Sequence, residues 1–332
     1  MHLNQLWVFY HVAMHKSFSQ AADALCLTQP SVSSQVKLLE DAYGLKLFER
    51  FGRSIKLTST GEILYSYAER IFNLTKEADS VIEEVKGMKS GSIKISASHT
   101  LGAYYLPAII DLFRKKYPWV EIQMDVGYTQ NVVESILTFK SDLGLIGRSV
   151  SHPNIVATPL WKEELVLIVP PNHRFARCRT ISVSQLQDEP FIMSEKGSGV
   201  RDITEEILSG KGPSPRIVME LGENEAIKHA VASGLGITFI SATVVRRELA
   251  AGILKAVRLS GARIMRQFSI IHHKDKYLSH LIKAFLDEVQ HFPADENALP
   301  REEKKISSHR SRLRKERKKR GSIEKSPLDL PD

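Results

Sequence analysis

Hydrophobic residues recur at helical spacing near the start of the chain and predict three short helices. The first is expected over residues 3–15, where apolar positions fall three or four apart. Ser19 can cap a second helix, and Thr28 can cap a third, with Pro30 in a first turn that tolerates its missing N–H. A tight turn over residues 26–28 joins these two helices. Two short helices joined by such a turn are typical of a helix-turn-helix unit.

The third predicted helix has one apolar and one polar face. Val32, Val36 and Leu39 share the apolar face, and the outward positions are polar: Gln29, Ser33, Ser34 and Lys37. Two β-rich runs over residues 45–50 and 54–58 then flank a short turn, which predicts a hairpin wing with basic residues at its tip. A generic three-helix subdomain with a surface hairpin is the alternative.

Residues 60–88 predict one long helix with two heptad registers. The apolar positions of this seam are Leu64, Tyr67, Ile71, Leu74, Ala78, Val81 and Val85. A seam of this length beside a DNA-binding head predicts a dimer, and paired recognition helices suit a repeated operator. Packing of the helix on its own domain is the alternative. Residues 86–92 are expected to end the helix and form a hinge.

From residue 93 onward, strand and helix patterns alternate, which predicts an α/β organisation with two parallel-type sheets. The expected strands are Ile93–Ala97, Val120–Val126, Leu143–Gly147, Leu165–Val169, Phe191–Met193, Ile217–Leu221 and Gly236–Ile240. The expected helices include Leu106–Tyr117 and Val132–Phe139.

The charge is concentrated near the end of the chain. The 332 residues, enough for two or three domains, carry a net charge of +8. Residues 301–320 hold 11 of the 46 basic and 3 of the 38 acidic residues, so the rest is balanced at 35 to 35. This Pro-punctuated stretch cannot bury a core, so residues 293–332 are expected to be disordered. It is either a basic arm on DNA phosphates or a solubilising tail.

Several classes of protein and of binding site are disfavoured, because the motifs that mark them are absent from the sequence. Cys26 and Cys178 lie far apart without metal-ligand spacing, so we expect neither a metal nor a disulfide framework. No dinucleotide, nucleophile-elbow or zinc-protease motif is seen, so we expect no cofactor and no enzyme. No export leader or membrane-length apolar run is seen, which predicts a cytoplasmic protein without a membrane partner.

Three loops at strand ends carry hydroxyls, free N–H groups and one arginine. Their candidate effector-binding residues are Ser98, His99, Thr100, Thr129, Ser194, Ser198, Gly199 and Arg201. Helix starts and hydroxyls favour an anion, and the guanidinium of Arg201 can add a bidentate contact. Simple helix capping is the alternative for each loop. Together they predict a site for a small anionic metabolite or oxyanion.

The run AADALCLTQPSVSSQVKLLEDAYGLKLFERFGRSIKLTSTGEILY closely resembles the start of LysR-type transcriptional regulators. The resemblance implies base reading by Gln29, Pro30 and Ser33 and a backbone contact by Arg53. The full candidate DNA-binding set is Gln29, Pro30, Ser31, Ser33, Ser34, Lys37, Arg50 and Arg53. Many members carry arginine where this chain has Ser34, which changes the donor offered at that base step.

The resemblance extends more loosely over the remaining chain and implies its domains. A winged helix-turn-helix head (1–59) precedes a coiled-coil linker helix and hinge (60–90), a regulatory domain (91–292) and the tail (293–332). The regulatory domain would have two Rossmann-like lobes, similar to type 2 periplasmic binding proteins, with the effector between them. Lobe I would comprise residues 91–160 and 266–292, and lobe II residues 161–265.

The segment LGENEAIKHAVASGLGITFIS and the loop at Gly197–Arg201 look like regulators of sulfur assimilation and carbon fixation. The expected function is a ligand-responsive transcriptional regulator that binds double-stranded DNA at an interrupted inverted repeat. A homodimer, a tetramer built from it and RNA polymerase are the expected protein partners. A transported-solute binding protein and an α/β enzyme are the alternatives, disfavoured by the winged start and the absent catalytic motifs.

Overall fold

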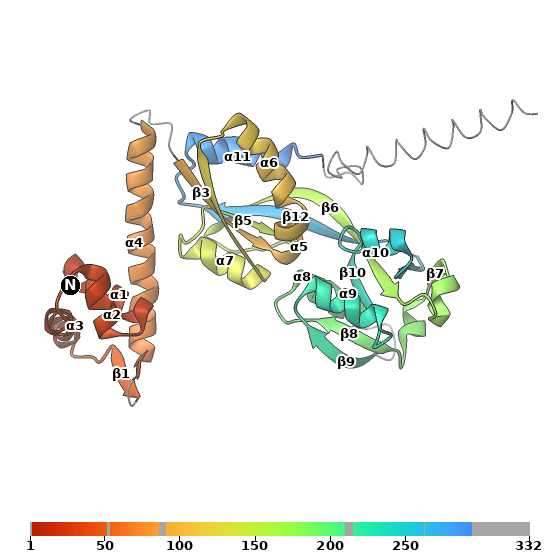
Figure 1. The fold of residues 1–332 in the computed structure, drawn as a ribbon, viewed down its shortest axis with the longest axis horizontal. Coiled ribbons are helices and arrows are strands. Elements are labelled where there is room, and N and C mark those ends of the chain that lie inside the picture. Colours follow the sequence, from red (N-terminus) through yellow and green to blue (C-terminus); the bar gives the residue numbers. More distant parts are fainter. Residues whose placement is uncertain (1, 52–53, 86–90, 210–214, 262, 294–332) are drawn as a thin grey trace, which may run out of the picture.

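A small helical head and a larger α/β body are connected by one long helix in the computed structural model (Figure 1). The structure describes residues 2–51, 54–85, 91–209, 215–261 and 263–293. The head comprises α1 (Leu3–His15), α2 (Phe18–Leu25), α3 (Gln29–Tyr43) and the hairpin strands β1 (Phe48–Phe51) and β2 (Ser54–Leu57). The connecting helix is α4 (Ser59–Val85).

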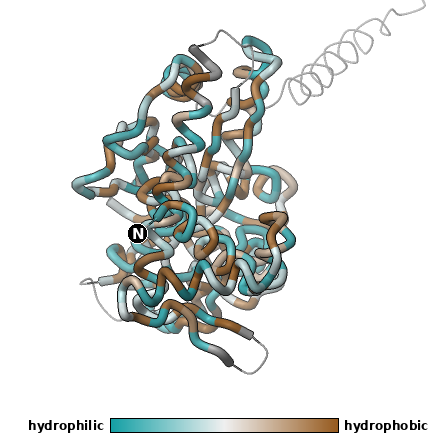
Figure 2. The backbone as a smooth tube through the Cα atoms, turned by 90° about the vertical axis from the view of Figure 1, so that its left-hand side faces the viewer, coloured by the Kyte–Doolittle hydropathy of each residue, from teal (hydrophilic) through white to brown (hydrophobic). Residues whose placement is uncertain are grey.

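Capping hydrogen bonds from side chains set where α2 and α3 begin. Thr28 caps α3 as expected, because its Oγ1 accepts from Ser31 N at 3.4 Å. The expected cap of α2 at Ser19 is wrong: Ser17 is extended and its hydroxyl accepts from Gln20 N. Phe18 is therefore already helical and can pack against the head core with the apolar face of α3. In Figure 2, where the head faces the viewer, hydrophobic and hydrophilic positions alternate along these helices.

Glu40 anchors the wing to the end of α3. Its carboxylate accepts from the backbone N–H groups of Leu47 and Phe48 at 2.9 and 3.4 Å, and from Lys46 Nζ at 2.6 Å. Burial alone would raise the pKa of Glu40, but the Lys46 and backbone hydrogen bonds outweigh it and lower this pKa. The ionised side chain thus fixes where β1 leaves the end of α3.

The body is built on one curled, mixed sheet of eight strands. Its order is β4-β3-β5-β12-β6-β11-β7, with β10 also paired to β6, and β8 and β9 form a separate parallel pair. The strands are β3 (Gly91–Ser98), β4 (Val120–Gly127), β5 (Leu143–Ile146), β6 (Ile155–Val169), β7 (Thr180–Ile181), β8 (Pro190–Ser194), β9 (Arg216–Leu221), β10 (Thr238–Ser241), β11 (Lys255–Leu259) and β12 (Ile264–His273).

The expectation of two parallel-type sheets is wrong for the middle of the body. Strands β6 and β12 are long and antiparallel, with Ile264 opposite Leu165 at one end and His273 opposite Ile155 at the other. They continue from one lobe into the other (Figure 1). The predicted strand Leu165–Val169 is only the last third of β6, because the mixed polar start of this strand did not show a strand pattern.

Helices cover the sheet in both lobes. They are α5 (His99–Tyr104), α6 (Leu106–Lys116), α7 (Thr129–Leu137), α8 (Gly199–Leu208), α9 (Asn224–Ala232), α10 (Arg246–Ala251) and α11 (His280–Gln290), with short 3₁₀ turns at Arg174–Arg177 and Val183–Leu186. Helix α7 begins three residues before the expected Val132, since Tyr128 is extended and the helix starts at Thr129. The predicted fold class, a winged helix-turn-helix head, a long linker helix and a two-lobed α/β domain, is confirmed.

Helix α4 is held to the body by a buried ion cluster. Lys276 Nζ lies 2.9 Å from Glu77 of α4 and 2.6 Å from Asp142, which itself accepts from Lys94 N at 2.7 Å. Asn73 Nδ2 also donates to Thr138 O at 3.1 Å. These contacts connect the linker helix to the lobe that contains β3 and β5. Within the described residues, no helix combines the length and apolarity that crossing a membrane requires.

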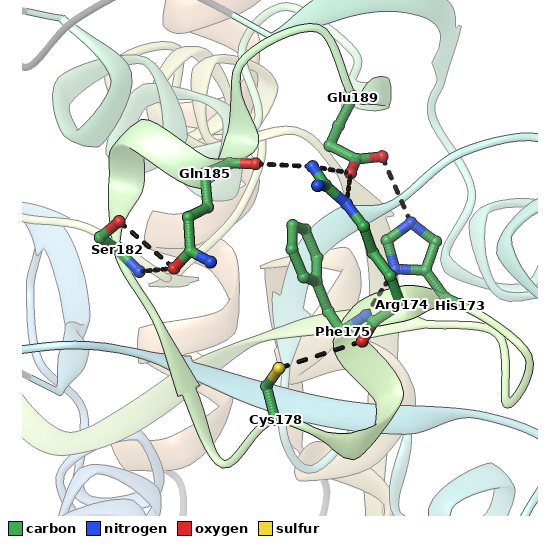
Figure 3. Close-up of polar contacts among 7 residues, drawn as sticks. All are labelled: His173, Arg174, Phe175, Cys178, Ser182, Gln185 and Glu189. Carbon is green, nitrogen blue, oxygen red and sulfur yellow. Dashed lines mark hydrogen bonds and ion pairs between the residues drawn. The ribbon is translucent and has the colours of Figure 1, made fainter.

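A second polar cluster secures the connection between β6 and β8 (Figure 3). Glu189 accepts from Arg174 Nε at 2.6 Å and lies 3.3 Å from His173 Nε2, while Arg174 Nη2 donates to Gln185 O. The exposed Cys178 contacts only the Arg174 carbonyl in this view. The described residues show no group of His, Cys, Asp and Glu placed to hold a metal ion.

Replacing Glu40 by Gln should destabilise the head by about 1–3 kcal/mol, since Gln cannot match a charged acceptor for three donors. The folded-state pKa of Glu40 is lowered, so its stabilisation is present above the unfolded-state pKa and is lost as pH falls through the folded value. Thermal unfolding followed by circular dichroism should therefore show a smaller acid-induced drop in Tm for Glu40→Gln than for wild type. Asp41→Asn, at the exposed neighbour, is the control, and equal pH profiles for wild type and Glu40→Gln would contradict this assignment.

Candidate functional site

The outward face of α3 presents small and polar side chains at the surface of the head. Gln29, Pro30, Ser34 and Lys37 are exposed, and Ser31 and Ser33 are half-buried. Gln29 Nε2 donates to Ser33 Oγ at 3.2 Å, so these two side chains form one polar unit. The opposite face packs Val32, Val36 and Leu39 into the head core. A helix with a rigid apolar back and small outward side chains can approach the edges of base pairs closely.

The wing is described on both sides of its tip. Strands β1 and β2 pair antiparallel, with Phe48 opposite Leu57 and Phe51 opposite Ser54. Arg53 and the side chain of Arg50 lie outside the described residues. Their contacts with DNA therefore stay predictions.

Helix α4 divides its apolar residues between its own head and the surface. Leu64 and Ile71 pack against the core formed by α1, α3 and β1, together with the buried Ala68 and Phe72. By contrast, Tyr67 and Leu74 are 56% and 50% exposed. Ala78 is exposed and Val81 is half-buried, while the side chain of Val85 lies outside the described residues.

The exposed residues form one stripe along α4. Ile63, Tyr67, Leu74 and Ile82 define what we call the α4 stripe, and each is at least half exposed. Their spacing keeps them on one side of a helix with 3.6 residues per turn. The sequence pattern found Tyr67 and Leu74 but missed Ile63 and Ile82, which lie outside its two heptad registers.

A small cavity lies where strands of both lobes end. Its lining comes from lobe I, lobe II and the crossing strand β12: Ser98, His99, Thr100, Gly127, Tyr128, Thr129, Gly147, Ser194, Ser198, Gly199, Val200, Gly222, Asn224, Ile240 and Arg266. Its volume is about 30 Å³, and a single water needs roughly 10–15 Å³ of such space. In this conformation the cavity therefore accommodates only a few non-hydrogen atoms.

Seven of the eight predicted effector residues line this cavity, and two hydroxyls in it have no partner. Ser98 Oγ and Thr129 Oγ1 are buried without a hydrogen bond within the part of the chain that the structure describes. Ser198 Oγ instead accepts from Val200 N at 3.3 Å and caps α8. Buried polar atoms are nearly always hydrogen-bonded, so an unpartnered pair in one cavity indicates a place for a ligand or water.

Three helices of eight or more residues begin at the cavity wall. They are α7, α8 and α9, whose first residues Thr129, Gly199 and Asn224 all line it. The free N–H groups and the helix dipole make each start favourable for negative charge. The sequence pattern does not show that the three helix starts meet, because Asn224 at the start of α9 lies outside the three predicted loops.

Arg201 does not line the cavity. Its guanidinium is taken by Glu220 at 2.8 Å and Glu205 at 2.7 Å, and it also donates to Ser194 O. Glu205 lies one helical turn away on α8 and Glu220 lies on β9. These two carboxylates therefore hold the guanidinium of Arg201 outside the cavity. The charged side chain that does line the cavity is Arg266, which the sequence reading missed because it lies on β12, far along the chain.

Polar contacts hold the two lobes together around the cavity. Tyr128 donates to Glu195, Arg148 pairs with Asp202, and Tyr104 donates to Glu225 at 3.2 Å. Burial, together with the Glu195 carboxylate, raises the pKa of Tyr128 to about 12. Tyr128 is therefore a neutral donor at physiological pH. These pairs join lobe I to lobe II beside the cavity.

Comparison with known proteins covers both parts of the chain. The model of the bacterial regulatory helix-turn-helix protein, lysR family, matches residues 3–62, and the LysR substrate binding domain matches residues 86–293. The chain is 37% identical over 285 residues to the uncharacterized HTH-type transcriptional regulator YeiE of Escherichia coli K12, covering 86% of this chain and 96% of YeiE.

Other relatives bear on the predicted subgroup. The RuBisCO operon transcriptional regulator of Allochromatium vinosum is 35% identical over 287 residues, covering 86% of this chain and 95% of that protein. The solved regulatory domain of Synechocystis CcmR in complex with 2-PG is 28% identical with a TM-score of 0.57, covering 60% of this chain and 96% of that domain. The likeness to carbon-fixation regulators is thus confirmed.

The two matched ranges coincide with the two parts of the structure. Residues 3–62 cover the head, and residues 86–293 cover the two-lobed domain on the other side of α4. Proteins of this kind are regulators, and their family is not an enzymatic one. The chain belongs to the LysR family of ligand-responsive, DNA-binding transcriptional regulators.

Proposed function

We propose that this chain is a dimeric transcriptional regulator whose effector is a small anion bound in the cavity between the lobes. The observation that carries the effector proposal is the pair of buried hydroxyls, Ser98 Oγ and Thr129 Oγ1, that have no partner in the described residues. The three helix starts around them favour negative charge. Ser194 and Ser198, which also line the cavity, offer further hydroxyls.

The size of the cavity constrains the effector. A space of about 30 Å³ suits a compact oxyanion, whereas a larger metabolite would require the lobes to open. Opening would break the contacts of Tyr128, Arg148 and Tyr104 across the cleft. A ligand that binds one lobe arrangement better than the other shifts the population between them. The 2-PG bound to the CcmR domain is one ligand to test beside sulfate and phosphate.

We propose that α3 reads bases in the major groove through Gln29, Pro30 and Ser33, with Ser31, Ser34 and Lys37 beside them. The exposure of this face and the capped, well-packed α3 support the assignment. Arg50 and Arg53 of the wing would contact the sugar–phosphate backbone. Two heads would bind an interrupted inverted repeat in double-stranded DNA.

The proposed dimer is held through the α4 stripe. Four exposed apolar side chains along one helix are an unusual surface for a monomer. We further propose that two such dimers form a tetramer, that the protein contacts RNA polymerase, and that it is located in the cytoplasm. We also propose the domain bounds 1–59 for the head, 60–90 for the linker helix and hinge, and 91–292 for the regulatory domain. The basic tail over residues 293–332 stays a prediction, because 294–332 lie outside the described residues.

Ser33→Glu should abolish specific DNA binding, because a larger, negative side chain would clash with base edges and repel phosphates. Fluorescence anisotropy with operator and unrelated duplexes at fixed salt should show at least a tenfold loss for the operator. Ser260→Glu, which adds the same charge at an exposed position of lobe II, should bind the operator like wild type. Wild-type operator affinity in Ser33→Glu would refute the recognition-helix assignment.

Leu74→Asp should dissociate the dimer, because two carboxylates in an apolar interface cost several kcal/mol. Leu74 is half exposed in one protomer, so its substitution should spare the head fold, unlike a change at Ile71, which packs against that core. Size-exclusion chromatography with light scattering should give the protomer mass. Leu235→Asp, the same substitution at an exposed position of lobe II, should keep the wild-type mass, and an unchanged mass for Leu74→Asp would place the interface elsewhere.

Ser98→Ala and Thr129→Val should each weaken anion binding about two- to tenfold, the range of a neutral hydrogen bond. Both should leave thermal stability unchanged or raised without ligand, because they remove a buried group that lacks a partner. Calorimetry with sulfate, phosphate and 2-PG tests this. Thr204→Val, whose buried hydroxyl bonds Val200 O within α8, is the control. Wild-type affinity in both cavity variants for a ligand that wild type binds would exclude these hydroxyls from the site.

A further inference from the structure

Among the described residues that line the cavity, Arg266 is the one arginine, and no lysine, aspartate or glutamate lines it. It is 4% exposed and lies near the start of β12, within the strand pair that runs through both lobes. Its Nε and Nη2 both donate to Glu163 Oε2, at 2.8 and 2.6 Å. Its Nη1 has no hydrogen-bond acceptor in the described part of the chain. This nitrogen faces the wall at Gly147, where an added Cβ would lie 3.3 Å from it.

Glu163 holds the guanidinium in a fixed orientation. It lies opposite Arg266 in the β6–β12 register and also accepts from Tyr105 OH at 3.0 Å and Ser241 Oγ at 2.5 Å. The guanidinium further stacks on Phe268, with Cζ 4.6 Å from the ring centroid. An arginine fixed on two sides in this way has one edge left to offer to a ligand.

The two other arginines near the cleft are paired with carboxylates outside the cavity. Arg201 is held by Glu205 and Glu220, and Arg148 pairs with Asp202. Neither lines the cavity. Among the described residues, Arg266 is therefore the cavity-lining arginine whose Nη1 is not engaged by a carboxylate.

We propose that Arg266 recognises the effector through Nη1, and that the effector presents an oxyanion oxygen at this point. This inference rests on the proposed function and assigns the charge contact within it. Because Glu163 already neutralises the guanidinium, selection depends on an acceptor oxygen placed at Nη1 rather than on net positive charge. Arg266 also lies in the antiparallel pair that joins the lobes, so a ligand here contacts both lobes and the strands between them.

The test compares sulfate and phosphate binding to full-length variants by calorimetry. Arg266→Met combined with Glu163→Gln removes the donor without leaving a buried carboxylate unpaired. We expect this double variant to lose about 10- to 100-fold in affinity, the range for a hydrogen bond to a charged group. Glu163→Gln alone keeps the guanidinium and should bind within about threefold of wild type or more tightly. Arg266→Lys, which cannot hold Glu163 and reach the cavity together, should also lose affinity.

The matched control is Arg258→Met combined with Glu164→Gln. This Arg–Glu pair joins β6 to β11 one residue further along β6, with contacts of 2.6 and 3.0 Å, and does not line the cavity. It should bind both anions like wild type. Wild-type affinity in the Arg266 double variant, or a tenfold loss in Glu163→Gln alone, would overturn the role of Arg266. Failure of wild type to bind either anion would instead overturn the inorganic oxyanion effector together with this role.

Discussion

The antiparallel pairing of β6 with β12 is the constraint on which the regulatory domain depends. These strands run through both lobes, and the ladder between them extends from Ile155 and His273 to Leu165 and Ile264. The lobes therefore share one continuous sheet and are more than two domains joined by a flexible chain. Their helix starts meet at a single cavity, because the crossing strands fix how one lobe faces the other. The buried Glu163–Arg266 pair stands at this crossing and beside the cavity.

Packed elements connect the strand that carries Arg266 to the head. Strand β12 leads to Lys276, which lies between Glu77 of α4 and Asp142 of lobe I. Removing one partner from such a buried ion cluster would leave an uncompensated charge, so α4 and lobe I are held in a defined arrangement. The Glu40 contacts then fix the wing relative to α3. Helix α4 thus contacts lobe I at Glu77 and the head core at Ala68 and Phe72.

Arg201 and Arg266 show how local sequence pattern and tertiary context differ. Arg201 follows a loop rich in Ser and Gly at a helix start, which is what an anion site looks like in sequence. Two carboxylates, one on its own helix and one on β9, take its guanidinium instead. Arg266 stands in an ordinary strand pattern, yet its place in the β6–β12 ladder brings it to the cavity. The sequence pattern does not encode that proximity, because it arises from pairing between strands about a hundred residues apart.

The sequence by itself determined the elements that depend on local chemistry. Helix periodicity, the Thr28 cap and the order of strands and helices predicted the head, the linker helix and an α/β body, and the polar loops at strand ends marked seven of the cavity residues. Tertiary structure decided the features that depend on residues far apart in the chain. These are the long antiparallel pairing of β6 with β12, the position of the start of α9 at the cavity, and the fact that Arg266 rather than Arg201 lines the cavity. It also divided the apolar residues of α4 between the head core and the exposed stripe. Periodicity shows that a residue is apolar, but only packing decides which surface covers it.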